Sequence, residues 1–324
     1  MPDLEAAATW IDERLVHAGS FRTGPLESVR VRPWGEVAKA ETDQGAVWLK
    51  VPGPTTAFEV GLYEVLARRV PDRILVPIAV DADRGWILLP EGGPPLGETT
   101  TGAAQADGMV AALARYGRLQ REVAADVDAL LALGVEDMRP AAMPVRFDQA
   151  VAAGERYVAK RGNHDDRASL ERVRARREWF GSLCEDLADR AGGASLDHND
   201  LHPWNILGDP RNPATLRFYD WGDSVIAHPF AAMLVPLGFA GRRSSRDLMR
   251  CRDAYLAEFG ELGTHAQLVE TLELACRVAK VARALTWERA MSTAGDGDDV
   301  DPDFARAPLA TLESLLDDSY LGGA

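Results

Sequence analysis

The pattern of the chain changes near residue 90, and this change limits the folds that are open to it. Before this point, short stretches that alternate apolar and polar residues are typical of β-strands. After it, apolar residues recur three and four positions apart, as amphipathic helices require. At 324 residues the chain suits one large bilobal domain or two ordinary ones. We therefore expect an α+β protein with a small strand-rich unit at residues 1–91 and a larger, mainly helical unit at residues 92–324.

The first unit is predicted to be a small sheet with one helix. Residues 29–32, 36–41 and 46–51 form a predicted meander, and two further strands are expected at residues 74–80 and 86–89. Pro52 and Pro54 end the third strand, after which Thr56 and Glu59 have the spacing of a capping box. The capping box predicts a helix that ends near Arg69. A hinge is expected at residues 89–93.

The second unit is predicted to be helical at residues 103–133, 147–189, 246–289 and 304–318. Between the last two regions an acidic stretch at residues 296–303 superficially resembles a calcium-binding loop. Val300 interrupts the order of its ligands, and no glutamate closes it. We expect a solvated linker there.

Residues 198–220 contain the pattern that points to chemistry. His198, Asp200 and Asn205 form the pattern HxDxxxxN, and Asp220 follows fifteen residues after Asn205. Residues 206–207 and 216–219 are predicted strands joined by a turn. In such an antiparallel hairpin the start of the first strand lies beside the end of the second. Asn205 and Asp220 are therefore expected at the same edge.

An amide oxygen and a carboxylate at one edge suit a magnesium ion. Magnesium prefers oxygen ligands and is commonly held by one or two protein groups together with substrate phosphates. Asp200 lies on the preceding loop, where its carboxylate could orient an acceptor hydroxyl and take its proton. The sequence predicts a base and metal ligands in one place. A zinc site at His198 and His202 is not expected, because no cysteine or further histidine has ligand spacing.

The segments HNDLHPWN (198–205) and YDWGD (219–223) resemble the aminoglycoside phosphotransferase and kinase-like family. Protein kinases usually show HRDLxxxN and DFG, whereas the second histidine and the tryptophan after the aspartate are more typical of the small-molecule branch. The resemblance implies a bilobal protein-kinase-like fold. It also implies that Asp200 is the catalytic base, that Asn205 and Asp220 bind Mg²⁺, and that His198 and His202 support the catalytic loop.

The resemblance extends to a nucleotide site in the first unit, with ATP as the expected donor and GTP left open. It implies that Lys50 binds phosphates and that Glu59 is its helix partner. Glu59 could instead only cap the helix, and Glu64 is a second candidate. Leu89, Glu91 and Gly92 are expected beside the base. The glycine-rich phosphate lid of protein kinases is missing, because only Gly35 stands before the lysine strand.

The acceptor is expected to be a small molecule with a hydroxyl group, such as an aminoglycoside or another cationic antibiotic, an amino sugar or a sugar-like metabolite. The formal net charge of −14 slightly favours cationic acceptors. Asp223, Trp287 and Glu288 are candidates for lining the acceptor site, although Asp223 could equally be a turn residue and Trp287 a core residue.

Charge and composition argue against several other classes of protein. A chain with 36 basic and 50 acidic residues is poorly suited to nucleic acid. No secretory signal, membrane span or CxxC pair is visible, so a cytoplasmic location is expected. The oligomeric state cannot be read from the sequence. Two alternatives stay open, namely a protein kinase and a nucleotide-binding regulatory protein without catalysis.

Overall fold

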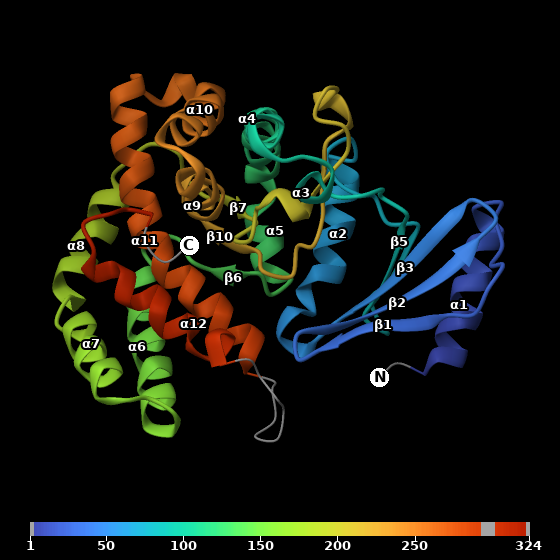
Figure 1. Ribbon diagram of the computed structural model, residues 1–324, viewed down its shortest axis with the longest axis horizontal. Helices are drawn as coiled ribbons and strands as arrows, with labels where there is room; N and C mark the ends of the chain where they lie inside the picture. The colour runs from blue at the N-terminus through green and yellow to red at the C-terminus, as the bar shows by residue number, and fades with distance from the viewer. Residues whose placement is uncertain (1–2, 293–301, 322–324) are drawn as a thin grey trace.

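A computed structural model describes residues 3–292 and 302–321 of the chain. A five-stranded sheet lies at one end of the molecule and a larger helical part at the other, with α2 (Phe58–Arg69) between them (Figure 1). This arrangement confirms the predicted α+β class with an N-terminal sheet. Residues 296–301 of the acidic stretch lie outside the described residues.

The sheet is antiparallel, with the strand order β1-β2-β3-β5-β4. Its strands are β1 (Glu27–Arg32), β2 (Gly35–Thr42), β3 (Gly45–Pro52), β4 (Ala79–Asp81) and β5 (Trp86–Pro90). Four of the five predicted strands are confirmed. The strand predicted at residues 74–80 is wrong for most of its length: Leu75 instead donates its N–H to Phe218 O at 3.1 Å, and Pro77 has no N–H to offer a ladder.

The strand-rich unit carries two helices rather than the one predicted. The additional helix, α1 (Leu4–His17), packs on the outer face of the sheet through Ala7, Trp10, Ile11 and Leu15, which recur at helical spacing. Trp10 meets Trp86 of β5 edge-on, with ring centroids 5.5 Å apart. Helix α2 covers the inner face and joins the core of the helical part.

The predicted capping box of α2 is also wrong. Ala57 occupies the N-cap position, and no side chain caps the helix. The Thr56 hydroxyl donates instead to Trp34 O at 3.0 Å. Glu59 is therefore not needed at the helix end and points elsewhere.

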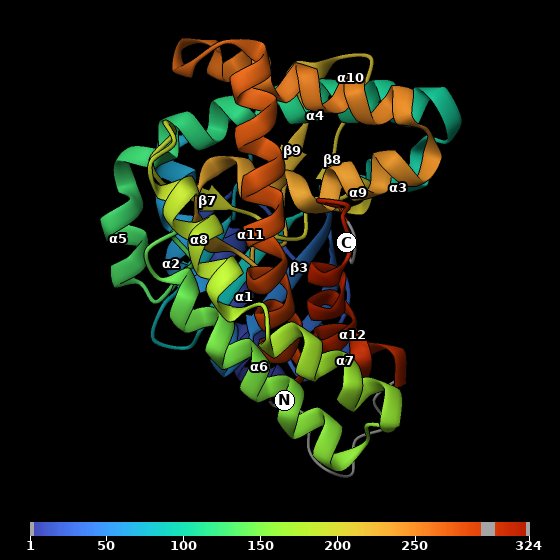
Figure 2. The same ribbon diagram turned by 90° about the vertical axis from the view of Figure 1, so that its left-hand side faces the viewer.

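All four predicted helical regions are helical over most of their length, but each is divided into shorter helices. Figure 2 shows α4 and α10 side by side across one end, with α11 running down from them. The helices are α3 (Leu96–Thr99), α4 (Gly102–Val123), α5 (Val127–Ala132), α6 (Met143–Lys160), α7 (His164–Arg174), α8 (Arg177–Ala188), α9 (Leu234–Arg243), α10 (Ser245–Leu256), α11 (His265–Met291) and α12 (Pro302–Glu313). Across residues 3–292 and 302–321, no helix combines the length and apolar character that a bilayer crossing needs.

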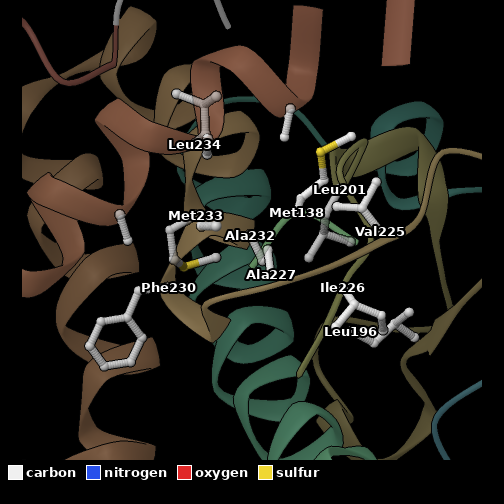
Figure 3. Packing of buried hydrophobic residues seen from close by; sticks show 14 of the residues in the cluster. Met138, Leu196, Leu201, Val225, Ile226, Ala227, Phe230, Ala232, Met233 and Leu234 are labelled. Carbon is white, nitrogen blue, oxygen red and sulfur yellow. The ribbon is translucent and has the colours of Figure 1, made fainter. Parts of the chain in front are cut away.

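Two small sheets hold the loops of the helical part. One joins β6 (Glu136–Asp137), β10 (Val225–Ala227) and β7 (Ser195–Asp197), and its side chains pack with Met138, Leu201 and Phe230 in the main core (Figure 3). The other is the predicted hairpin, β8 (Ile206–Leu207) with β9 (Arg217–Phe218). Burial of these short strands fixes the ends from which the site residues project.

Candidate active site

The loop after β7 is held by its own polar groups. Asn199 has a left-handed φ of 58°, and its N–H donates to Asp197 Oδ1 at 2.6 Å. Its side-chain amide donates to Thr286 Oγ1 of α11 at 2.7 Å. These bonds stabilise a conformation that a residue other than glycine rarely adopts. The next residue, Asp200, is thereby presented at a defined point.

His198 ties this loop to the hairpin. It is fully buried, and its Nε2 lies 3.0 Å from Tyr219 O. Because a carbonyl can only accept, Nε2 carries the proton. Burial lowers the pKa of His198 below its usual value, although the Tyr219 carbonyl partly opposes this, so the ring is neutral near pH 7. A supporting position is what the resemblance implied for this residue.

Asp200 receives three polar contacts. Arg283 Nη2 donates to Oδ1 at 2.8 Å, Asn205 Nδ2 donates to Oδ2 at 3.2 Å, and His202 Nε2 lies 3.3 Å from Oδ2. Burial alone would raise the pKa of Asp200, but Arg283 and His202 outweigh it and lower the pKa to about 2. The carboxylate is therefore ionised at any physiological pH.

The hairpin brings Asn205 and Asp220 to one end, as predicted. The Tyr219 N–H donates to Asn205 O at 3.4 Å at the open end of the hairpin. Asp220 is the next residue after this hydrogen bond. Asp220 has a φ of 64°, a left-handed value that turns the chain sharply out of β9. Asn205 also donates its side-chain N–H to Asp200 O at 2.8 Å, so its amide nitrogen is occupied and its Oδ1 is the atom left to bind a cation.

Lys50 links the sheet, α2 and the hairpin. Its Nζ donates to Glu59 Oε1 and to Asp220 Oδ1, each at 2.5 Å. Burial opposes the charge of Lys50, but the two carboxylates raise its pKa above the usual value. Burial raises the pKa of Glu59, with Lys50 opposing it. Glu59, rather than Glu64, is therefore the partner of Lys50, and its Oε1 also accepts from Trp221 N at 3.0 Å.

Two cavities meet at Lys50 and Asp220. The larger, of about 610 Å³, lies against the sheet and the residues after β5, and Leu89, Glu91 and Gly92 are among the residues that line it. The smaller, of about 170 Å³, contains Asp200 and extends toward α11. Four residues line both cavities: Arg30, Val37, Lys50 and Asp220.

The candidate acceptor residues separate in the structure. Asp223 and Trp287 line the smaller cavity. Burial and the neighbouring Asp200 raise the pKa of Asp223 to about 6, against the pull of Arg283. Glu288 lines neither cavity, which corrects its expected position. It lies one residue further around α11 and pairs with Arg156 of α6 at 2.8 Å.

Two cationic residues of the site were missed from the sequence. Arg283 donates to Asp200, to Asp223 Oδ2 at 3.2 Å and to Asn199 O at 2.8 Å, and its guanidinium lies 4.7 Å from the ring centroid of Trp287. Arg283 precedes Trp287 by one helical turn, so the position of Trp287 was the available signal. Arg30 lies on β1, and no sequence motif marks it.

The fold is that of known phosphotransferases. A macrolide 2'-phosphotransferase type I shares 16% identity at a TM-score of 0.55, with 95% of this chain and 97% of that chain covered. An ethanolamine kinase from Plasmodium vivax shares 14% identity at a TM-score of 0.62, with 90% and 82% covered. An aminoglycoside phosphotransferase from Streptomyces rimosus, solved with ADP and streptomycin, shares 16% identity at a TM-score of 0.50, with 87% and 99% covered.

These similarities establish the class of fold, that of the kinase-like small-molecule phosphotransferases, and confirm the resemblance drawn from the catalytic-loop motifs at the level of the fold. Scans against protein-family models and against curated proteins find no match.

Proposed function

We propose that the protein is a phosphotransferase that moves the γ-phosphoryl group of ATP, with Mg²⁺, onto a hydroxyl of a small molecule. The observation that carries this proposal is the junction of the two cavities. A phosphate donor in the larger cavity and an acceptor in the smaller one would meet at Lys50 and Asp220, beside Asp200. Direct transfer needs such a meeting point, since donor and acceptor must be held in line.

The larger cavity suits a nucleotide. Leu75, Leu89 and Leu207 offer apolar surface for a base, and Lys50 stands at the inner end for the phosphates. The backbone after Pro90 would supply hydrogen bonds, because Pro90 itself has no N–H. The ADP bound to the Streptomyces rimosus phosphotransferase supports a nucleotide donor, and ATP is the donor that we propose.

The residues at the hairpin end fit a magnesium ion. Asn205 Oδ1 and the carboxylate of Asp220 offer two hard oxygens, and no group of three His, Cys, Asp or Glu suited to a metal occurs in the part of the chain that the structure describes. A site with two protein ligands completed by phosphates is typical of magnesium. When bound there, the ion would neutralise charge on the phosphates during transfer.

Asp200 would act mainly by orienting the acceptor. Its pKa of about 2 makes it a weak base before reaction, but an ionised carboxylate accepts a hydrogen bond from a hydroxyl at any physiological pH. In a loose transition state the hydroxyl proton becomes acidic only late, so a weak, well-placed base suffices. Arg283, Asn205 and His202 hold the carboxylate in position.

The smaller cavity suits an acceptor that carries both hydroxyl and amine groups. Asp223 offers a carboxylate, and Trp287 and Phe304 offer aromatic surface. Carboxylates beside aromatic faces bind ammonium groups well. The macrolide, ethanolamine and aminoglycoside substrates named for the structural neighbours are amine-bearing alcohols, which supports the same class for this chain.

The direct test is a screen of hydroxylated amines, amino sugars and antibiotics with γ-labelled ATP and Mg²⁺. The wild-type protein should transfer label to at least one class of compound, and Asp200→Ala should transfer far less label to the same compound. Label that appears only on protein, or only as free phosphate with every compound, would argue against a small-molecule acceptor.

A further inference from the structure

Arg30 stands in the same cross-strand row as Lys50. Along the sheet, Arg30 pairs with Val37, and Val37 pairs with Lys50. Partners in an antiparallel ladder share a face, and neighbouring strands lie about 4.8 Å apart, so the two cationic residues are about 10 Å apart at one level. Both line the two cavities at their junction.

A β-bulge gives Arg30 this position. Ser28 pairs with Ala38, but Arg30 pairs with Val37, so Val29 is an extra residue in β1. Without the bulge, Val29 would stand opposite Val37, and Arg30 would point to the other face of the sheet. The distortion therefore puts a charge where a regular strand would put an apolar residue.

Arg30 is the unpaired cation of the site. Three cationic side chains line the cavities, and Lys50 and Arg283 each bind two carboxylates. Within residues 3–292 and 302–321 the Arg30 guanidinium makes no hydrogen bond or ion pair, and the residue is exposed. The charge of Arg30 acts on Asp220, but a guanidinium without an ion pair that lines both cavities can bind an anion without first breaking one.

The turn beside Arg30 is not free to close over phosphates. Trp34 O accepts from Gly53 N at 2.9 Å and from Thr56 Oγ1 at 3.0 Å. These bonds fasten the β1–β2 turn to the segment after β3. A fastened two-residue turn without a run of glycines cannot offer the row of backbone N–H groups of a phosphate lid.

We propose that Arg30 binds the terminal phosphates of the nucleotide and so substitutes for the missing glycine-rich lid. This inference rests on the proposed function and adds a phosphate-binding residue that no motif marks. A planar, forked donor suits phosphate oxygens. Lys50, on β3, would contact the same phosphates from two strands away.

The test compares nucleotides that differ in phosphate number. Binding of MgATP, MgADP and AMP is measured by titration calorimetry for wild type, Arg30→Gln, Arg30→Lys and Arg32→Gln. Arg32 is the matched control, since it lies on the same strand and lines neither cavity. Arg30→Gln should weaken the binding of MgATP by about 10- to 100-fold and the binding of AMP by less than about twofold. Arg30→Lys should bind MgATP with intermediate affinity, and Arg32→Gln should bind it almost as tightly as wild type.

Two kinds of result would overturn the role proposed for Arg30 without affecting the proposed function. One is equal loss of MgATP binding in Arg30→Gln and Arg32→Gln, which indicates a general effect of charge. The other is wild-type MgATP binding, or equal weakening of MgATP and AMP, in Arg30→Gln. A wild-type protein that binds none of the three nucleotides would overturn the proposed function as well, so the two failures are distinguishable.

Discussion

At the scale of single residues, Arg283 holds the acidic groups of the smaller cavity together. Its side chain is only 8% exposed and touches Asp200, Asp223 and Asn199 O. A buried cation shared by two carboxylates lowers the free-energy cost of ionising both beside each other. The position of Asp200 therefore depends on a residue 83 positions away in the chain.

Replacing Arg283 with glutamine should change the pH dependence of transfer. The Arg283 charge lowers the pKa of Asp200, so its loss should move the acid limb of the pH–rate profile to higher pH. We expect kcat to fall by about 10- to 100-fold, because the carboxylate also loses its orientation. Arg283→Lys should restore part of the rate. An acid limb that stays at the wild-type pH would mean that Arg283 only packs the cavity.

The free energy of unfolding should decrease with rising pH because of Asp197. Burial raises the pKa of Asp197 from 3.8 to about 7, against its hydrogen bond with Asn199 N and the charge of Arg283. Between these values the folded protein keeps a proton that the unfolded chain has released. The stabilising contribution of protonated Asp197 is therefore fully present below about pH 4 and is lost as the pH approaches 7. The slope from this residue is at most about 1.4 kcal/mol per pH unit.

Urea unfolding at several pH values tests this prediction. Asp197→Asn keeps an acceptor for Asn199 N but cannot ionise, so its stability should vary less between pH 4 and 7 than that of wild type. Asp83→Asn, in an exposed turn, is the control and should follow wild type. A slope for Asp197→Asn that matches wild type would contradict the assignment.

At the scale of elements, α1 closes the outer face of the sheet. Trp10 is 3% exposed between the helix and β5. Trp10→Ala should lower the free energy of unfolding by about 3–5 kcal/mol through lost burial and the cavity left behind. Val16→Ala on the same helix, where the side chain is 70% exposed, should cost less than about 0.5 kcal/mol. Equal unfolding midpoints in urea for the two variants would show that α1 does not stabilise the sheet.

The β8–β9 hairpin requires glycine at position 208. Gly208 has a φ of 109°, and a Cβ there would clash with Thr215 O. Gly208→Ala should destabilise the protein by about 2 kcal/mol or more and weaken MgATP binding, because β8, which directly follows Asn205, must shift. Gly181→Ala lies in α8, where an added Cβ meets only Arg177 Nη1 at 3.7 Å, and should bind MgATP like wild type. Unchanged MgATP binding in Gly208→Ala would contradict the coupling.

Local spacing allowed the hairpin and the catalytic loop to be predicted. Asn205 and Asp220 are brought together by two short strands and one turn, a geometry that depends on neighbouring residues alone. Lys50 could be placed in its strand for the same reason. Helix α1 was missed although its apolar residues have helical spacing, because the first unit was taken as mainly strands.

Residues whose position depends on distant packing could not be predicted. Arg283 meets Asp200 only because α11 lies across the loop after β7. Arg30 faces the cavities only because of a one-residue bulge, which the sequence does not reveal. Glu288 was misplaced because one residue along a helix turns a side chain about 100° around the axis.

At the scale of the whole molecule, contacts between the sheet-bearing unit and the helical part hold the two cavities together. Arg289 of α11 donates to Gly222 O at 3.0 Å and stacks over Phe58 of α2, 5.3 Å from its ring centroid. Glu59 of α2 joins Lys50 to the backbone of Trp221. The two cavities are thus fixed relative to each other by contacts between α2, α11 and the segment after β9.

We propose that Asp200 lies where an acceptor hydroxyl meets the donor phosphate. The most direct measurement compares wild type and Asp200→Ala for phosphoryl transfer to the acceptor found in the screen and for MgATP affinity. We predict that kcat falls by about 10²- to 10⁴-fold, while the Kd for MgATP stays within about threefold because Asp200 lines only the smaller cavity. Wild-type turnover by a folded Asp200→Ala protein would rule out this role of Asp200.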